Sequence, residues 1–170
     1  MLDNIKQQLP DFATDVRINL GKILDLAQTN DLSEQQIAGA ALAVSYHLGN
    51  KLLINELLIL PYTKELQEAA KLAASLMAMT NIYYRFVHLS EHAELAQVPA
   101  GLRMQGMMNP GIDRITFEIM SLAVSILNGC GSCISAHTHQ LQEHGLTAQA
   151  IARIGRISAV IHSTHVTLGL

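Results

Sequence analysis

The sequence is poor in charged and aromatic residues. Asp, Glu, Lys and Arg make up 15% of its 170 residues, against about 25% in ordinary domains, and it contains three Phe, four Tyr and no Trp. Intrinsic disorder requires much charge and few apolar residues, and it is excluded because 49% of this chain is apolar. The core must therefore be aliphatic and rich in Ala, Leu, Ile and Met, a composition that favours helices.

Basic patches and long apolar runs are also lacking. The 11 basic and 14 acidic residues give a formal net charge of −3, whereas nucleic-acid binding requires a positive footprint. The apolar run from Ile119 to Leu127 is too short for a bilayer, which takes about 20 apolar residues. The first residues lack a positive segment followed by an apolar one, so no signal peptide is predicted. We expect neither a nucleic-acid nor a membrane partner.

Proline, glycine and capping residues divide the chain into helical segments, and no alternating strand pattern occurs. Ser33-Glu-Gln-Gln36 is a capping box that opens a helix, Pro61 closes one, and Asp113 and Thr147 can each cap a later one. In the segment over 63–89, one apolar stripe is formed by Leu72, Leu76, Met79, Tyr83 and Phe86. The predicted fold is therefore all-α, with helices over about 11–28, 33–48, 50–60, 63–89, 113–127, 130–144 and 147–165, and a long loop over 97–111.

A short internal repeat indicates two related halves. Leu42-Ala-Val-Ser45 recurs as Leu122-Ala-Val-Ser125, and Gly49 and Gly129 stand at the same offset. Four common residues can match by chance, but the order of the surrounding helices matches as well. We therefore predict a single helical domain that arose by duplication.

The two predicted halves differ in chemistry. The non-catalytic half spans about residues 1–96 and the catalytic half about 112–170. Only the second half carries reactive side chains at the corresponding positions, because Asn50, Leu53 and Leu57 stand where Cys130, Cys133 and His137 stand.

The sequence contains only two cysteines, Cys130 and Cys133, which form one C-x-x-C motif. A structural disulfide that closes so small a loop contributes only about 2 kcal/mol on the chain-entropy estimate. A helical domain of this size has little need of it. The pair is therefore predicted to have a chemical role, not a structural one, and the chain to be cytoplasmic rather than secreted.

Both cysteines are candidate nucleophiles. Cys130, Cys133 and His137 lie at i, i+3 and i+7 and so share one helix face. His137 is one turn from Cys133 and could take its proton, and the thiolate is the reactive form of a cysteine. Cys130 lies near the helix start, where the dipole and free N–H groups favour a thiolate. Proximity of the base favours Cys133, whereas helix position and expected exposure favour Cys130.

Glu118 lies in a helix that is otherwise apolar. Ser121 and Ser125 follow at i+3 and i+7, so that the three side chains form a narrow polar strip. A carboxylate there could orient His137 and raise its basicity, directly or through one water. The strip could equally be the solvated face of the helix.

A zinc site is the alternative interpretation of the cysteine pair. Cys130, Cys133 and His137 could supply three ligands, but a structural site normally has four. No other cysteine exists and Glu118 would be an unusual fourth ligand, so no metal is predicted. The pair His88 and His92 is attributed to chance. The other histidines are predicted to be surface or hydrogen-bonded core residues, namely His47, His139, His144, His162 and His165.

The pattern Glu118-x11-Cys130-x2-Cys133-x3-His137 after an apolar helix resembles the AhpD family of alkyl hydroperoxidases, in the carboxymuconolactone decarboxylase-like superfamily. The segments Arg17–Leu24 and Leu32–Gln36 and the two-half layout extend the resemblance over nearly the whole chain. The family implies an all-helical fold that assembles as a trimer or a multiple of one. It also implies lipoamide-dependent peroxidase activity.

The resemblance also implies roles for the site residues. Cys133 would be the peroxidatic thiolate, and Cys130 the resolving thiol that pairs with it in a disulfide. Glu118 and His137 would form the proton relay. Well-known members carry His immediately before the second cysteine, where this chain has Ser132, so an auxiliary role there rests on a hydrogen-bonding substitute.

The same resemblance implies external partners rather than a bound cofactor. The reductant would be dihydrolipoamide on a lipoylated acyltransferase subunit, and an AhpC-like peroxiredoxin would be a further disulfide partner. Two other classes stay open from the residues. One is a thiol–disulfide carrier without strong peroxidase activity, and the other is a non-enzymatic redox sensor or zinc-stabilised module.

Overall fold

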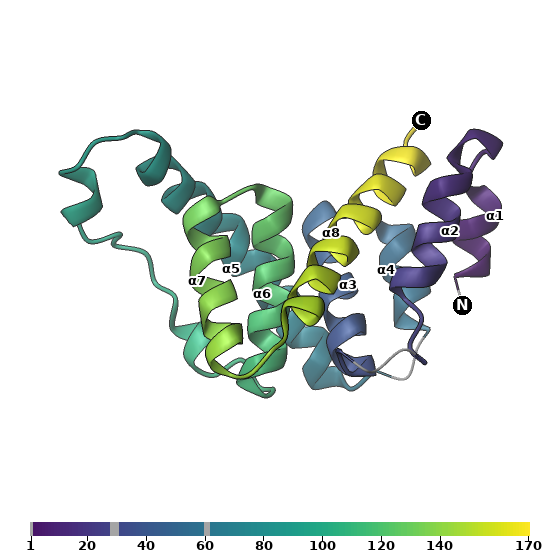
Figure 1. Ribbon diagram of the computed structural model, residues 1–170, viewed down its shortest axis with the longest axis horizontal. Coiled ribbons are helices and arrows are strands. Elements are labelled where there is room, and N and C mark those ends of the chain that lie inside the picture. Colours follow the sequence, from purple (N-terminus) through teal and green to yellow (C-terminus); the bar gives the residue numbers. More distant parts are fainter. Residues whose placement is uncertain (1, 28–30, 60–61) are drawn as a thin grey trace.

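A computed structural model describes residues 2–27, 31–59 and 62–170 (Figure 1). Within these ranges the chain forms eight α-helices, three 3₁₀ turns and no strand, which confirms the all-α prediction. The helices are α1 (Asp3–Gln8), α2 (Thr14–Ile23), α3 (Glu34–Leu48), α4 (Lys51–Leu58), α5 (Lys64–Leu89), α6 (Arg114–Asn128), α7 (Gly131–Glu143) and α8 (Ala148–Leu168).

Capping side chains set the starts of the long helices. Ser33 Oγ accepts the N–H of Gln36 at 3.3 Å, and Gln36 Oε1 accepts the N–H of Ser33 at 2.9 Å, which completes the predicted capping box of α3. The predicted caps of α6 and α8 are confirmed in the same way, since Asp113 and Thr147 each accept a backbone N–H three residues on. Thr63 caps α5 in the same manner.

The N-terminal segment departs from the prediction. The helix predicted over 11–28 begins as a 3₁₀ turn, and α2 itself ends at Ile23. Asp25 Oδ1 accepts the N–H of Ala27 at 3.0 Å, a local bond that competes with helical pairing. Position 28, position 60 and Pro61 lie outside the described residues, so the predicted ends there are not described. Helix α1 was not predicted.

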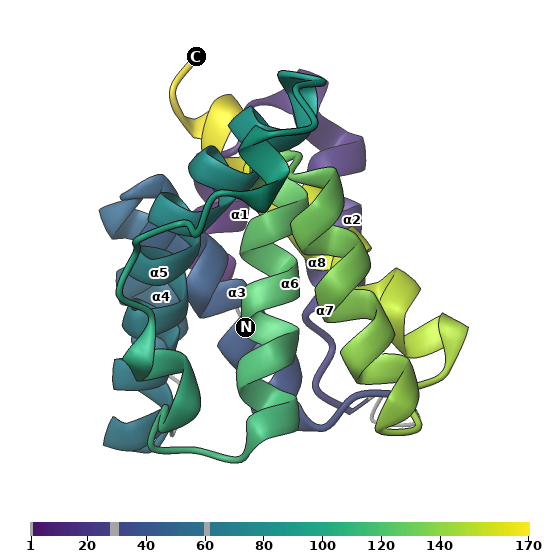
Figure 2. The ribbon, with the colours of Figure 1, turned by 90° about the vertical axis from the view of Figure 1, so that its left-hand side faces the viewer.

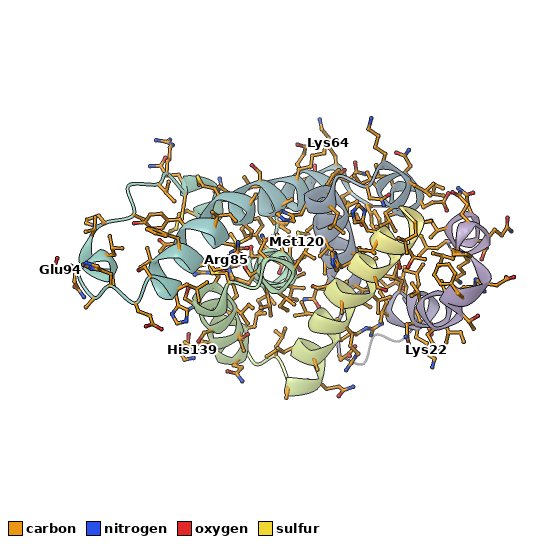
Figure 3. All side chains as sticks on the ribbon, turned by 90° about the horizontal axis from the view of Figure 1, so that it is seen from above. Lys22, Lys64, Arg85, Glu94, Met120 and His139 are labelled. Carbon is orange, nitrogen blue, oxygen red and sulfur yellow. A yellow bond between two sulfur atoms is a disulfide. The ribbon has the colours of Figure 1, made fainter. Side chains whose placement is uncertain are left out.

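The core is built around α3 and α6, which lie against each other at its centre (Figure 1). Helix α5 packs on both from one side and α8 from the other. Gly39 of α3 leaves room for the side chain of Met120 of α6, which lies near the middle of the molecule (Figure 3). Residues 116–125 of α6 are all buried, so this helix supplies much of the core.

Helix α5 turns a face of small residues to the core. Its buried side includes Ala69, Ala70, Ala73 and Ala74, which allow close approach to α3 and α6. The apolar stripe predicted on this helix is not its buried face, because four members are half-buried and Phe86 is 54% exposed. The small residues, which allow close packing of helices, thus form the buried face of α5, and the larger side chains do not.

A long loop joins α5 to α6 at the end of the molecule opposite α1 and α2 (Figure 1). It is longer than the predicted 97–111, because residues 90–113 hold no α-helix, only 3₁₀ turns at Leu95–Gln97 and Gln105–Met108. A Cβ on Gly106 would lie 3.0 Å from Leu72 of α5, so the backbone there lies close to the helix. The loop thereby covers part of the apolar stripe.

The sequence echo coincides with equivalent backbone geometry. Helices α3 and α6 each have 15 residues and end in left-handed glycines, Gly49 at φ 66° and Gly129 at φ 63°. The next residues, Asn50 and Cys130, are the N-caps of α4 and α7, with φ/ψ of −81°/99° and −83°/94°. The backbone therefore turns from α3 into α4 in the same way as from α6 into α7.

Candidate functional site

The two cysteines lie at the junction of α6 and α7, which run side by side (Figure 2). They form a disulfide with a Cα–Cα distance of 5.3 Å. Cys130 is the N-cap of α7, and its sulfur accepts the N–H of Cys133 at 3.4 Å. Cys133 is 8% exposed and Cys130 is fully buried, so the expectation that Cys130 would be the more exposed sulfur is wrong for this oxidised form.

Glu118 and His137 are brought together from neighbouring helices. Glu118 Oε2 of α6 lies 2.6 Å from His137 Nδ1 of α7, and each residue is only 8% exposed. The contact is direct and needs no bridging water. Ser121 and Ser125 are fully buried, so the interpretation of the polar strip as a solvated face is wrong.

The Glu118 contact fixes the tautomer of His137. An ionised carboxylate only accepts hydrogen bonds, so Nδ1 carries the hydrogen and Nε2 keeps the lone pair. A histidine oriented in this way can accept a proton at Nε2 while the carboxylate stabilises the resulting cation. The buried setting strengthens this interaction, because little water screens it.

An apolar cavity of about 310 Å³ adjoins Cys133 and His137. Helix α5 forms one wall with Met77, Thr80 and Tyr84, and the 3₁₀ turn region of the long loop contributes Met104 and Met107. The remaining lining residues come from α7 and are Ser132, Cys133, Ala136 and His137. A small molecule in this space would lie against the disulfide and the imidazole together.

Ser132 lies between this cavity and a second one. The second cavity, of about 360 Å³, is lined by Ser132, by Tyr84 and His88 of α5, and by Glu91 and His92 just after that helix. Ser132 Oγ is 3.6 Å from Cys130 Sγ. The serine therefore contacts the sulfur of Cys130, and its auxiliary role stays a prediction.

Neither a metal site nor a membrane span is found in the described part of the chain. Among residues 2–27, 31–59 and 62–170, no three His, Cys, Asp or Glu side chains converge in a way that could hold a metal ion. Within the same residues, no helix is both long enough and apolar enough to cross a membrane.

Sequence reasoning missed a polar cluster next to the cysteines. His47, Asn81 and Asn128 come from α3, α5 and α6 and are joined by hydrogen bonds. The signal was an asparagine in the middle of the long α5 segment and another directly before Gly129, at the end of an apolar helix.

Comparison with known proteins identifies the family of this chain. The family described as "Carboxymuconolactone decarboxylase family" matches residues 93–167, which include all four site residues. Relatives named alkyl hydroperoxide reductase AhpD match nearly the whole chain. The one from Coxiella burnetii (strain RSA 493 / Nine Mile phase I) is 49% identical over 166 residues, covering 95% of this chain and 93% of the relative. Those from Frankia alni and Bradyrhizobium sp. are 41% and 42% identical over 167 and 170 residues, covering 96% and 98% of this chain and 89% and 92% of the relatives.

This chain belongs to the AhpD family. The similarity to AhpD proteins runs over 95% of this chain, whereas the superfamily match is confined to residues 93–167, which hold the cysteines. The resemblance read from Glu118, Cys130, Cys133 and His137 is thereby confirmed at the level of the family.

Proposed function

We propose that this chain is a thiol peroxidase that reduces hydrogen peroxide and alkyl hydroperoxides through Cys130 and Cys133. One observation carries the proposal: His137, which is paired with buried Glu118, lines the same apolar cavity as Cys133. A peroxide bound there would meet a cysteine with a base in reach and an apolar surface for its alkyl group. The names of the relatives agree with this activity.

The first step requires a thiolate on Cys133. His137 accepts the thiol proton at Nε2, with Glu118 stabilising the imidazolium. The thiolate attacks the distal peroxide oxygen and the O–O bond breaks, so that Cys133 becomes a sulfenic acid. The leaving alkoxide takes the proton from His137 and departs as the alcohol.

Cys130 completes the turnover. Its thiol attacks the sulfenic sulfur, a Cys130–Cys133 disulfide forms, and water leaves. An external dithiol, for which we propose dihydrolipoamide on a lipoylated acyltransferase subunit, then reduces the disulfide by exchange and is itself oxidised. No cofactor bound to this chain takes part.

Peroxide consumption by substituted proteins tests these roles. With dihydrolipoamide in excess, Cys133→Ser is expected to abolish peroxide consumption and His137→Phe to reduce kcat/KM at least tenfold. His139→Phe is a matched control, because His139 lies on the same helix but is exposed and pairs with the exposed Glu143. Undiminished activity in Cys133→Ser or His137→Phe would refute the role assigned to that residue.

A thiol–disulfide carrier is the second candidate, and it would use the same disulfide. A carrier for an AhpC-like peroxiredoxin would use the same Cys130–Cys133 pair without reacting with peroxide. Such a protein would be reduced by dihydrolipoamide, yet would consume peroxide no faster than a free thiol. A peroxide assay with and without an added peroxiredoxin separates the two functions.

We further propose that the chain acts in the cytoplasm, where its reductant is available, and assembles as a trimer or a multiple of one. Exposed apolar side chains on α5 support association, since Ile82, Phe86 and Leu89 are 54%, 54% and 68% exposed. The division into a non-catalytic half (about 1–96) and a catalytic half (about 112–170) is supported by the matching turns after α3 and α6. Light scattering after size-exclusion chromatography tests the assembly, and a monomer would refute it.

A further inference from the structure

A partly buried chain of hydrogen bonds joins three helices at the end of α6 that precedes the cysteines. His47 Nε2 of α3 lies 2.9 Å from Asn128 Oδ1 of α6, and Asn128 Nδ2 donates to Asn81 Oδ1 of α5 at 3.0 Å. Asn81 Nδ2 donates in turn to Ser125 Oγ at 3.0 Å. Asn81 and Ser125 are fully buried, so losing one of these bonds would leave polar groups without water to replace it.

The hydrogen bonds of this chain run in one direction, from donor to acceptor. Because Asn128 Nδ2 is a donor, its Oδ1 is the acceptor that faces His47, and His47 therefore donates from Nε2. The hydroxyl of Ser125 accepts from Asn81 and donates to Met77 Sδ at 3.5 Å. Met77 lines the cavity at Cys133, so the chain runs from α3 to the wall of the candidate active site.

The same residues hold the backbone that leads into Cys130. The carbonyl of Ser125 accepts the N–H of Cys130 at 3.3 Å, while its hydroxyl is bound by Asn81. Asn128 lies two residues before Cys130, and its carbonyl is bound by the guanidinium of Arg85 from α5. Figure 3 shows Arg85 between Met120, near the middle of the molecule, and the loop that carries Glu94. Side chains of α5 therefore form three hydrogen bonds with the last turn of α6.

We propose that Asn81 and Asn128 are positioning residues that hold the last turn of α6 so that the sulfur of Cys130 stays within bonding reach of Cys133. Gly129 separates this turn from Cys130 and is left-handed, so the direction in which Cys130 leaves α6 depends on where the turn is held. Neither asparagine lines the cavity. They act through Cys130 and not on the peroxide.

The other half of the molecule provides a comparison. Asn50 occupies the position that corresponds to Cys130, and its Nδ2 lies 3.0 Å from Nδ1 of His165 on α8. There a side chain of the crossing helix bonds the capping residue itself. In the catalytic half the N-cap of α7 is Cys130, whose sulfur takes part in the redox chemistry. There α5 binds the last turn of α6, just before the cap, instead of the cap itself.

Positioning decides between two fates of a sulfenic acid on Cys133. In one, the Cys130 thiol attacks it, and a disulfide and water form. In the other, a second hydroperoxide oxidises it to a sulfinic acid and leaves as the alcohol. Only the first fate depends on where Cys130 lies. Displacing the turn before Cys130 should therefore slow disulfide formation and increase overoxidation. This peroxide step rests on the proposed function, but the position of Cys130 does not.

A redox equilibrium tests the position without peroxide. The protein disulfide and two glutathione thiols exchange with the protein dithiol and glutathione disulfide, so the oxidised fraction reports the effective concentration of Cys130 at Cys133. We expect Asn81→Leu to lower that effective concentration about tenfold, equivalent to about 1.4 kcal/mol. His165→Leu, which breaks the corresponding bond in the other half, should change it less than twofold.

The redox result is read together with folding and peroxide measurements. Thermal unfolding shows whether each variant is folded, and Asn128→Ala replaces Asn81→Leu if the latter is not. A folded Asn81→Leu or Asn128→Ala protein with the equilibrium of the unsubstituted chain would overturn the proposal, as would an equal shift in His165→Leu. After a peroxide pulse, mass spectrometry should find several-fold more sulfinic acid on Cys133 in Asn81→Leu. If the unsubstituted chain does not react with peroxide, the proposed function fails, while the glutathione equilibrium still decides the role of Asn81.

Discussion

Replacing Glu118 by Gln removes the charge from the site and keeps the shape. The Gln side-chain oxygen can still accept the Nδ1–H of His137, so the ring orientation and tautomer are retained. What is lost is the charge that stabilises the imidazolium formed when His137 takes the Cys133 proton. The substitution therefore isolates the electrostatic contribution of Glu118.

The size of the effect follows from the geometry. The Glu118–His137 bond is 2.6 Å long and both residues are 8% exposed, so it is short, charge-assisted and poorly screened. Hydrogen bonds to charged groups contribute about 1.5–3 kcal/mol and neutral ones about 0.5–1.5 kcal/mol, so the charge adds about 1–1.5 kcal/mol. At about 1.4 kcal/mol per tenfold, its loss corresponds to a decrease in kcat/KM for peroxide of roughly 5- to 12-fold.

The assay is the initial rate of peroxide consumption with dihydrolipoamide in excess, over a range of peroxide concentrations. Glu143→Gln is the matched control, because Glu143 also binds a histidine of α7, at 3.3 Å, but on the exposed surface where such pairs contribute little. We expect its rate to be unchanged. If folded Glu118→Gln keeps kcat/KM within twofold of the unsubstituted chain, Glu118 does not activate His137 through its charge.

Four further substitutions test the fold. Gly129→Ala and Gly49→Ala place a Cβ on left-handed residues, at φ 63° and φ 66°, with no atom within 4 Å, so each should lower the free energy of unfolding by about 1–2 kcal/mol. Only Gly129→Ala should alter the glutathione equilibrium, and equal redox shifts in the two variants would contradict this. Tyr62→Phe removes a buried hydroxyl that has no hydrogen-bond partner in the described structure, and should raise the free energy of unfolding, measured with urea, by about 1 kcal/mol. A lower free energy of unfolding would refute this. Asp31→Asn removes the charge that pairs with buried Arg153 at 2.6 Å, and should lower the free energy of unfolding by about 3 kcal/mol, whereas a change below 1 kcal/mol would show that the pair is not needed.

Local signals predicted most of the helix boundaries. Ser33, Asp113 and Thr147 were predicted as caps because short polar side chains satisfy the free N–H groups of a helix start, and all three do so. Such signals act within four residues and depend little on the rest of the chain. The end of α2 was missed because the competing turn at Asp25 is equally local but has no distinctive sequence pattern.

Burial was harder to predict, because it depends on which elements meet. The stripe containing Leu72 and Phe86 had the larger side chains, yet α5 packs through its alanines and leaves Phe86 largely exposed. Cys130 was expected to be exposed at a helix start, but the neighbouring helices and the disulfide bury it. Periodicity defines the faces of a helix and does not show which face another helix will cover.

The candidate site was predicted in part. The helical spacing of Cys133 and His137 required only that α7 exist. The Glu118–His137 contact required α6 and α7 to pack in one register, which spacing alone left open. The hydrogen bond of Asn81 to Ser125 required α5 to meet the end of α6; the sequence shows a polar residue in α5, but no pattern in it encodes that meeting.

The most direct test of the proposed chemistry is the order of oxidation events at Cys133. The protein is reduced without oxygen, mixed with one equivalent of peroxide, quenched at successive times and analysed by mass spectrometry with a sulfenic acid trap. We expect a trapped sulfenic acid on Cys133 that appears first and declines as the Cys130–Cys133 disulfide forms. A sulfenic acid found on Cys130 instead, or a disulfide that forms no faster than with a free thiol pair, would contradict the proposal.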